Sequence, residues 1–302
     1  MGLGGITISN KFGDVSFENM NVSLEILKRR YSEGNFPSYS ERIGRLKRLV
    51  ELVEDNSEEI TTAIEKDFGT RHKQISLIAD INSTLQFANH TIKNLSKWIK
   101  PSKKSANFPL NLIGAKASIQ YQPFGVVGII SPWNFPVNLS IGPLVDIFAA
   151  GNGAMIKLSE FVPNTSELIA ELISKKFTEE EVIVVNGNMQ TSVDFTKLAF
   201  DHLIYTGSSD IAKKVSAAAA NNLVPLTLEL GGKSPVVVGE NAKVDKIVSR
   251  IMFGKLFNGG QICVSPDYLL MPANKVDDFV VGAKNFIHEK FPTIKNNPDY
   301  TS

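Results

Sequence analysis

The chain has 302 residues, which is room for about two domains. Its hydrophobic fraction of 43% and its charged fraction of 21% are those of an ordinary soluble globular protein. A net charge of +1 excludes a strong electrostatic attraction to nucleic acid or to an acidic membrane. A single cysteine cannot form an intramolecular disulfide, which is typical of a reducing compartment, and we expect a cytoplasmic protein.

Neither a targeting segment nor a membrane span is expected. Residues 1–6 lack the basic and apolar segments of a signal peptide. Residues 117–145 carry no charge and are long enough to cross a bilayer. Four prolines and two asparagines interrupt this stretch, so it predicts buried strands and loops instead.

Residues 40–100 predict a layer of helices, because apolar residues recur there at helical spacing. Asn56 and Glu59 form a candidate capping pair for one of these helices, and a further helix is expected over residues 74–100. Three charged residues of this layer are assigned to solvated faces, namely Arg45, Arg48 and Glu51.

Short apolar runs alternate with amphipathic helices from residue 126 onward. Strands are expected at residues 126–130, 154–158, 182–185 and 203–205, and helices at 137–150, 164–177, 191–199 and 210–221. This alternation predicts a parallel sheet covered on both faces, which is a doubly wound α/β domain, over residues 1–230. Residues 117–122 predict an edge or bridging strand, within a bridging region of about residues 105–123.

The same alternation restarts in residues 231–302. Strands are expected at residues 235–238 and 268–271, and helices at 244–257 and 276–291. Two or three strands in about seventy residues make a poor core, because a parallel sheet needs both faces covered. We therefore expect the first, incomplete part of a second α/β domain.

Polar residues follow several of the predicted strands, where the ligands of an open α/β sheet bind. Asn134 follows the strand at 126–130, and its amide could donate to a developing oxyanion; a turn asparagine is the alternative. Lys157 lies in an apolar run, where lysine is uncommon, and is followed by Ser159 and Glu160. Lys157 and Glu160 either pair with each other or hold the two hydroxyl groups of a ribose.

Gly207 and Ser208 lie at the start of the predicted helix 210–221. The free N–H groups of a helix N-terminus suit a pyrophosphate, whereas an ordinary serine cap is the alternative. Gly187 either lets a ligand approach the backbone or is a plain turn glycine. No G-x-G-x-x-G pattern occurs, so a standard Rossmann dinucleotide site is not supported.

Glu229 and Cys263 are the candidates for acid–base and nucleophilic chemistry. Glu229 lies between two leucines, where burial would make its carboxylate a better base; a structural glutamate is the alternative. Cys263 follows Gly259-Gly260-Gln261-Ile262, which indicates a loop that nears a substrate rather than a small buried residue. A thiol with a nearby base can form and hydrolyse an acyl-thioester. The histidines show no zinc-ligand spacing, and no metal site is expected.

Five motifs in this order resemble the aldehyde dehydrogenase superfamily, from about residue 20 to the last residue. They are Ser131-Pro132-Trp133-Asn134-Phe135, Lys157-Leu158-Ser159-Glu160, Tyr205-Thr206-Gly207-Ser208, Leu228-Glu229-Leu230-Gly231-Gly232-Lys233 and Gly260-Gln261-Ile262-Cys263. The run Leu223-Val224-Pro225 and the run Pro266-Asp267-Tyr268 look most like members that act on aromatic, coniferyl-type aldehydes.

The resemblance implies NAD(P)-dependent oxidation of an aldehyde to a carboxylic acid through a thiohemiacetal and a thioester. Cys263 would be the nucleophile, Asn134 and the Cys263 N–H would hold the oxyanion, and Glu229 would activate the hydrolytic water. Glu160 would favour NAD over NADP by accepting from the ribose 2′-hydroxyl. The implied cofactor-binding residues are Trp133, Lys157, Ser159, Glu160, Gly187, Gly207, Ser208 and Leu230.

Two departures from the family pattern are present. Leu158 replaces a usual proline, which removes a fixed φ but no hydrogen-bonding group. The sequence ends at Ser302, before the family's Glu-x-Phe-Gly-Pro segment and before the C-terminal strand through which its homo-oligomers assemble. We expect the 302-residue chain alone to be weakly active or inactive and to associate through uncovered sheet edges.

Two other functions are open at this level. One is a thiol acyltransferase or hydrolase that pairs Cys263 with a histidine such as His202. The other is an inactive remnant that binds only nucleotide or a full-length partner. The acyltransferase or hydrolase leaves Asn134, Lys157 and the Thr206–Ser208 turn unexplained.

Overall fold

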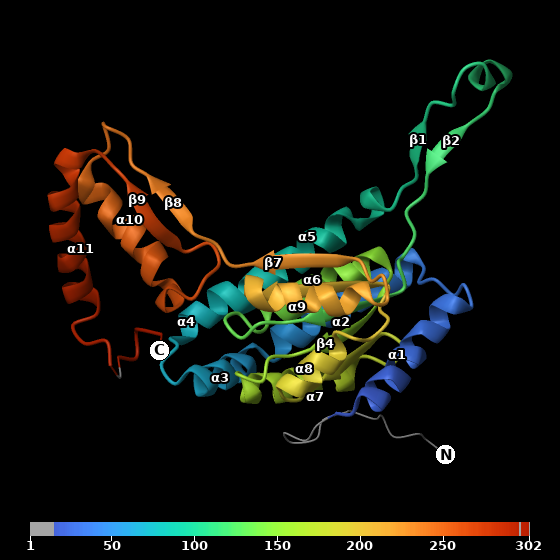
Figure 1. The fold of residues 1–302 in the computed structure, drawn as a ribbon, viewed down its shortest axis with the longest axis horizontal. Helices are drawn as coiled ribbons and strands as arrows, with labels where there is room; N and C mark the ends of the chain where they lie inside the picture. The colour runs from blue at the N-terminus through green and yellow to red at the C-terminus, as the bar shows by residue number, and fades with distance from the viewer. Residues whose placement is uncertain (1–14, 296, 302) are drawn as a thin grey trace.

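The computed structural model describes residues 15–295 and 297–301. Residues 1–6, for which no targeting pattern is predicted, lie outside the described residues. Figure 1 shows a large α/β body, a smaller lobe that holds the C-terminal residues, and a long arm that projects from the body.

The large body is built on a five-stranded sheet in the order β5-β4-β3-β6-β7. All four neighbouring pairs are parallel. The strands are β3 Val126–Ile130, β4 Gly153–Lys157, β5 Val182–Val185, β6 His202–Gly207 and β7 Leu226–Leu230. The strands β3, β4, β5 and β6 match the four predicted strands to within two residues, because a strand buried on both faces is a short apolar run in the sequence. No bounds were predicted for β7.

Helices cover both faces of this sheet, which confirms the doubly wound α/β class. One apolar core joins the sheet to the helices α2, α3, α5, α6 and α7, and contains Val127 and Ile129. The other joins it to α1, α8 and α9, and contains Val126. Neighbouring residues of β3 thus enter opposite cores, as the two-residue period of a strand requires. The crossing helices are α6 Asn138–Ala150, α7 Pro163–Lys176, α8 Met189–Phe195 and α9 Ser209–Ala220.

The N-terminal helical layer is α1 Phe17–Ser32, α2 Tyr39–Asp55, α3 Ser57–Phe68, α4 Lys73–Ser76, the π-helix η1 Leu77–Asn82 and α5 Ser83–Trp98. The prediction omitted α1. The predicted capping pair at Asn56 is wrong, because Asn56 Nδ2 donates to the Leu52 carbonyl of the preceding helix at 2.8 Å and makes no cap hydrogen bond. A true capping box instead begins α2, between Ser38 and Glu41.

Arg45 is buried, and its assignment to a solvated face is wrong. The α2 helix lies on the sheet, so Arg45 reaches Glu181 at 3.0 Å and the Asn152 carbonyl at 3.2 Å. Arg48 also binds Glu181, at 2.6 Å. Glu51 is exposed, as expected.

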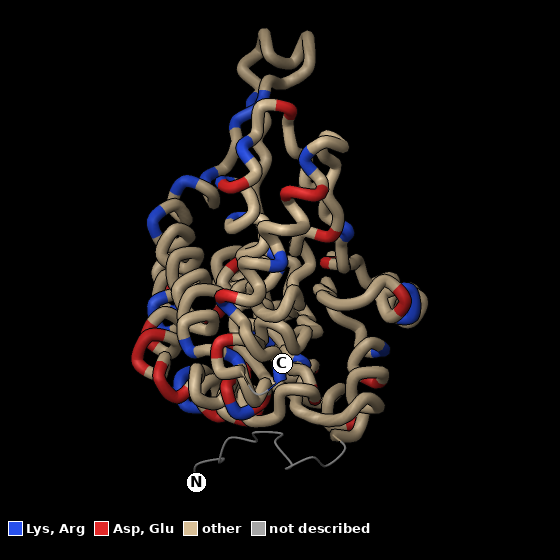
Figure 2. The backbone as a smooth tube through the Cα atoms, turned by 90° about the vertical axis from the view of Figure 1, so that its left-hand side faces the viewer, with Lys and Arg blue, Asp and Glu red and all other residues tan. Residues whose placement is uncertain are grey.

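The projecting arm is an antiparallel pair of β1 Ser102–Lys104 and β2 Ala117–Ile119, closed by the 3₁₀ turn η2 Leu110–Ile113. The predicted strand at residues 117–122 is therefore shorter, and its partner in the lysine-rich segment was not predicted. Figure 2 shows basic and acidic residues interspersed along the chain and an uncharged tip on the arm. The bridging role of this region stays a prediction.

The smaller lobe has two parallel strands, β8 Ser234–Val237 and β9 Pro266–Leu270. Its helices are α10 Val244–Leu256 and α11 Val276–Lys290, with the short 3₁₀ turns η3 Phe257–Gly260 and η4 Ala273–Lys275. A separate apolar core centred on Val248, Met252 and Phe279 holds the lobe together. Val237 of β8 is 76% exposed, so one face of this two-stranded sheet lies open. The domain limits at residues 230 and 231 stay a prediction.

Among the residues that the structure describes, no helix has the length and apolar composition needed to cross a bilayer.

Candidate active site

The carboxyl ends of the five parallel strands meet at one edge of the sheet, and the predicted site residues lie there. The chain leaves β3 for β4 on one side and later returns to β6 on the other, so β3 marks the topological switch point. A ligand of such a sheet binds at this switch point. Trp133 and Asn134 follow β3, and Gly187 follows β5. Lys157, Gly207 and Leu230 are the last residues of β4, β6 and β7, and Ser159, Glu160 and Ser208 come shortly after these strand ends.

Asn134 is hydrogen-bonded to the loop that carries Cys263. Its side-chain Nδ2 donates to the Gln261 carbonyl at 3.0 Å. In return, Asn258 Nδ2 donates to the Asn134 carbonyl at 3.2 Å. Two segments 127 residues apart are thereby held together at the switch point.

The segment after Glu229 also reaches this loop. A Cβ atom added to Gly232 would lie 2.6 Å from the Cys263 carbonyl oxygen, so only glycine fits there without displacement. The segments that carry Asn134, Gly232 and Cys263 therefore lie against one another. The predicted convergence of Cys263, Asn134 and Glu229 on one carbonyl stays a prediction. Cys263 is exposed, which contradicts the alternative of a small buried residue.

The cysteine loop has a backbone that turns sharply away from α10. Asn258, Gly259 and Gly260 have φ values of 52°, 62° and 77°, a run in the left-handed region. A Cβ atom on Gly259 would lie 2.8 Å from the Thr301 carbonyl, and one on Gly260 would lie 2.9 Å from the Lys255 carbonyl. The glycines thus admit the chain's own backbone and shape the loop that presents Cys263.

Glu229 is exposed, so the expectation of burial between its two leucines is wrong. β7 is the edge strand of the sheet and pairs only with β6. Leu226 and Leu230 pack on the core beneath, whereas Thr227 and Glu229 alternate to the other face of the strand, where they are exposed. An edge strand does not bury both of its faces, which an apolar run in the sequence cannot reveal.

Lys157 and Glu160 form the pair that their spacing predicted. The Lys157 side chain is 1% exposed; its Nζ donates to the Leu158 carbonyl at 2.6 Å and lies 3.3 Å from Glu160 Oε2. Burial lowers the pKa of the Lys157 ammonium, and the Glu160 carboxylate opposes that shift. Ser159 is buried beside the pair, and its Oγ accepts from the Phe161 N–H at 3.3 Å.

The N-terminus of α9 follows β6, which lies on the opposite side of β3 from the strand that carries this pair. Ser208 Oγ caps the helix by accepting from the Ile211 N–H at 3.4 Å, which is the cap that was the alternative prediction. The first-turn N–H groups of Ser209 and Asp210 precede the capped one, and the helix dipole adds positive character to this end. Gly207 makes room for the Tyr205 hydroxyl, which would lie 2.3 Å from an added Cβ atom.

The remaining predicted residues flank this edge. Gly187 lies against Thr191, whose Oγ1 would be 2.3 Å from an added Cβ atom. The buried oxygens Asn186 Oδ1 and Thr191 Oγ1 have no hydrogen-bond partner within the described part of the chain. Trp133 is 37% exposed and its ring lies 6.0 Å from that of Phe68.

His202 lies at the wrong end of the sheet to serve Cys263 as a base. It is the first residue of β6, whose six residues place it ~16 Å from the carboxyl end at the usual rise per residue. Its Nε2 lies 2.8 Å from Thr227 Oγ1, and its ring stacks on Phe124 with centroids 5.6 Å apart. The acyltransferase or hydrolase alternative with this histidine is therefore not supported.

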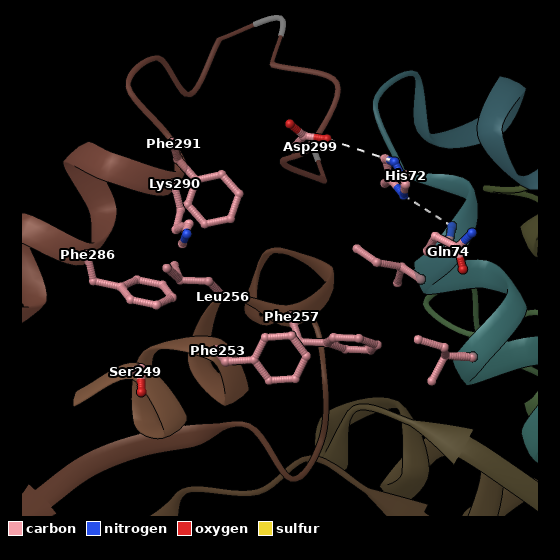
Figure 3. Close-up of a pocket in the computed structure, with 12 residues that line it drawn as sticks. His72, Gln74, Ser249, Phe253, Leu256, Phe257, Phe286, Lys290, Phe291 and Asp299 are labelled. Atoms are coloured by element: carbon pink, nitrogen blue, oxygen red, sulfur yellow. Dashed lines mark hydrogen bonds and ion pairs between the residues drawn. The ribbon is translucent and has the colours of Figure 1, made fainter. Parts of the chain in front are cut away.

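An apolar cavity of about 580 Å³ lies next to the cysteine loop, between α4 and the α10–α11 pair. Figure 3 shows Phe253, Phe257 and Phe286 around it, with His72 paired to Asp299 at its edge. Phe257 immediately precedes Asn258, the residue that binds the Asn134 carbonyl. Cys263 itself does not line the cavity.

Three residues of the site were not predicted: Arg71, Asp80 and Asn258. Arg71 donates to the Asn134 carbonyl at 2.8 Å, and Asp80 accepts from Arg71. Asp80 is a charged residue inside the apolar run Leu77-Ile78-Ala79-Asp80-Ile81. A charged residue in an apolar run is the same signal that identified Lys157 as a candidate. Asn258 precedes a glycine pair, a turn signal. For Arg71 the sequence contains no signal.

Residues 31–295 match the model of the aldehyde dehydrogenase family, and the chain belongs to that family. It is 47% identical over 284 residues to a probable coniferyl aldehyde dehydrogenase of Caulobacter vibrioides, covering 94% of this chain and 59% of that protein. It is 43% identical over 288 residues to the coniferyl aldehyde dehydrogenase of a Pseudomonas species, covering 95% of this chain and 59% of that protein.

Solved structures agree with this assignment. The substrate-bound state of Staphylococcus aureus AldH superposes with a TM-score of 0.86 at 34% identity, covering 93% of this chain and 61% of that one. A Mycobacterium tuberculosis aldehyde dehydrogenase complexed with NAD⁺ has a TM-score of 0.82 at 23% identity, covering 90% of this chain and 56% of that one, and it shares the fold. The chain thus spans about 59% of the length of the curated relatives it matches.

Proposed function

We propose that this chain carries the nucleophile and the cofactor-binding residues of an enzyme that oxidises an aldehyde to a carboxylic acid with NAD(P)⁺. The observation that carries the proposal is the bond from Asn134 Nδ2 to the Gln261 carbonyl, two residues before Cys263. It places an amide donor against the loop of the only cysteine of the sequence, at the ligand-binding edge of the sheet.

Cys263 attacks the aldehyde carbon as a thiolate and forms a thiohemiacetal. The oxygen of that adduct carries the developing negative charge. Asn134 has a second N–H beside the one that binds Gln261, and it can donate to this oxygen together with the Cys263 N–H. Such a donor, held in place before the reaction, is worth ~100- to 1,000-fold in rate.

Glu229 activates the water that releases the acid from the thioester. Its strand β7 ends at Leu230, and the chain continues through Gly231 to Gly232, which lies against the Cys263 carbonyl. Because Glu229 is exposed at the sheet edge, water has direct access to its carboxylate.

The residues at the carboxyl ends of the strands fit a dinucleotide. Lys157 and Glu160 offer a donor and an acceptor for the ribose hydroxyls, and the α9 N-terminus offers N–H groups for the pyrophosphate. The unpaired buried oxygens of Asn186 and Thr191 add polar groups near Gly187. The bound cofactor would supply the hydride acceptor. Glu160 favours NAD⁺, because a carboxylate repels the 2′-phosphate of NADP⁺.

The substrate is an aromatic, coniferyl-type aldehyde. The names of two relatives support this, and so does the cavity lined by Phe253, Phe257 and Phe286 beside the cysteine loop. We further propose a homo-oligomeric enzyme in the cytoplasm, where the exposed Cys263 stays reduced.

Two assays test this function. Oxidation is followed as NADH formation from NAD⁺ and coniferyl aldehyde, and acylation is followed as the burst of nitrophenolate from p-nitrophenyl acetate. Cys263→Ser should remove both signals, and Asn134→Ala should slow both. An ester burst that survives Cys263→Ser contradicts the proposal. Turnover of esters that is unaffected by Asn134→Ala would favour a hydrolase.

A further inference from the structure

A fully buried ion pair lies behind the oxyanion donor. Arg71 and Asp80 are joined at 2.6 Å, and both side chains are 0% exposed. Burial raises the pKa of the Asp80 carboxyl, and Arg71 and two backbone N–H groups oppose that shift. Desolvation makes a buried ion pair costly, so the presence of this pair raises the hypothesis that it has a specific geometric role.

The pair holds both ends of the segment that begins with Asn134. One guanidinium nitrogen of Arg71 donates to the Asn134 carbonyl at 2.8 Å, while another binds Asp80. The second oxygen of Asp80 accepts the N–H groups of Val137 and Asn138, each at 3.1 Å. The turn between β3 and α6 is therefore fixed at its entry and at its exit by two residues that form one unit.

Neighbouring groups hold this unit rigidly. The Arg71 guanidinium lies over the rings of Phe68 and Phe135, at 4.8 and 5.1 Å from their centroids. Asp80 lies in the π-helix η1, a geometry that is uncommon and often marks a functional site. The guanidinium plane can therefore neither rotate nor shift without disturbing both rings.

The unit also reaches the nucleophile loop. The carbonyl of Asn134 accepts from Arg71 on one side and from Asn258 of the cysteine loop on the other. The side chain of Asn134 then donates to Gln261 of the same loop. One residue is thus held by the buried pair and by the loop together.

We propose that Arg71 and Asp80 are positioning residues, which fix the backbone of Asn134 so that its amide meets the oxygen of the adduct on Cys263. This inference rests on the proposed function, since it presupposes that Asn134 is the oxyanion donor. The pair touches neither substrate nor cofactor and acts through Asn134 alone.

The chain offers a matched control. Arg45 is also buried and bonded to a carboxylate, Glu181, but it binds the Asn152 carbonyl at the other end of the sheet. Arg71→Lys and Arg45→Lys both replace a planar forked donor by a single ammonium. Both should lower the melting temperature, whereas only Arg71→Lys should disturb Asn134. Asp80→Asn, which keeps the shape of the side chain but removes the charge that compensates Arg71, is a second variant.

The experiment compares two reactions of Cys263 in the full chain, without cofactor. In the first, the sulfur attacks p-nitrophenyl acetate, the ester C–O bond breaks, nitrophenolate leaves, and a thioester forms through an oxyanion. In the second, the sulfur displaces iodide from iodoacetamide, and no oxyanion forms. A positioning role affects the first reaction and spares the second.

Arg71→Lys and Asp80→Asn, where folded by circular dichroism, should slow acylation by ~10- to 100-fold, the loss expected from displacing a catalytic group by up to an ångström. Alkylation should stay within about twofold of the unaltered protein, because the thiolate itself is unchanged. Arg45→Lys should keep the original ratio of the two rates.

The proposed function and the positioning role of the Arg71–Asp80 pair fail in different variants. If Cys263→Ser keeps the burst, or if Asn134→Ala leaves acylation unchanged, the proposed function fails first. If those two variants behave as expected but Arg71→Lys and Asp80→Asn keep the original ratio of acylation to alkylation, the positioning role is overturned. An equal loss of both rates, shared with Arg45→Lys, shows a structural pair only and also overturns it.

Discussion

Replacing Gly232 by alanine is expected to displace the loop that carries Cys263, the proposed nucleophile. The added Cβ atom would lie 2.6 Å from the Cys263 carbonyl oxygen, and real Cβ contacts do not fall below 3.0 Å. The two backbones must therefore separate by at least ~0.4 Å, because a carbonyl cannot rotate aside as a side chain can. Overpacking of this kind costs ~1–3 kcal/mol of stability.

The displacement also reaches the chemistry. A shift of about 1 Å in a catalytic group costs about 100-fold in rate, so a shift of roughly half that size should slow acylation of Cys263 by about 10-fold. Gly231→Ala is the matched control, because nothing lies within 4 Å of its added Cβ atom and its φ is not positive. Both variants remove one glycine from the same pair, so their effects on the unfolded chain are alike.

The assay is the burst of nitrophenolate from p-nitrophenyl acetate, together with unfolding in urea. We expect Gly231→Ala to keep the acylation rate of the unaltered chain and to be at least as stable, and Gly232→Ala to lose both rate and stability. Equal acylation rates in the two variants would refute the placement of Gly232 against Cys263.

Two further substitutions test the cofactor edge and the helical layer. Lys157→Met should weaken NAD⁺ binding about 10-fold, since it removes one charged hydrogen-bond donor to the ribose; titration by intrinsic fluorescence measures this, and unchanged affinity would assign Lys157 to packing with Glu160 alone. Glu41→Gln should lower the melting temperature at neutral pH by removing charge from the α2 capping box, where hydrogen bonds from the Ser38 backbone and from Arg30 lower the pKa of Glu41 from 4.5 to about 2. A group with a lowered pKa stabilises the fold above pH 4.5, and this effect is lost as the pH falls toward 2. The difference in stability between the unaltered chain and Glu41→Gln, below ~1 kcal/mol for this half-exposed group, should therefore disappear over that pH interval. A difference in stability that does not depend on pH would contradict the lowered pKa of Glu41.

The sequence predicts the sheet better than the helical layer, for a physical reason. β3 and β5 were predicted with their observed bounds, because strands buried on both faces are short apolar runs between turns. The helices of the N-terminal layer carry charges on every face, and periodicity does not tell which charge is buried. Arg45 binds Glu181, which is 136 residues away along the chain, and Arg71 binds the carbonyl of Asn134, which is 63 residues away. No local pattern encodes such pairings.

The candidate site was predicted as a set of residue types at strand ends, and its topology follows from the parallel order. Parallel strands put all their carboxyl ends on one edge, so Asn134, Lys157 and Ser208 had to lie on the same edge of the sheet once the alternation was identified. The position of Cys263 does not follow from this rule, because its loop belongs to the smaller lobe. The exposure of Glu229 could not be predicted either, since it depends on β7 being the edge strand.

The contacts that assemble the site run mainly through main-chain carbonyls. Asn134 binds the carbonyl of Gln261, Asn258 and Arg71 bind the carbonyl of Asn134, and Gly232 leaves room for the carbonyl of Cys263. A carbonyl is present whatever the side chain, so these contacts restrict the backbone path and the residues that donate to it. The assembly of the site therefore depends on the identity of the few donor residues and of the glycines. It does not depend on the side chains of residues that contribute only a carbonyl. Among the described residues, the side-chain hydrogen bonds that join the Cys263 loop to the large body all involve Asn134, and Arg71 of the buried Arg71–Asp80 pair binds the carbonyl of the same residue. If Cys263 is the nucleophile that we propose, Asn134 is therefore the residue through which the large body positions it.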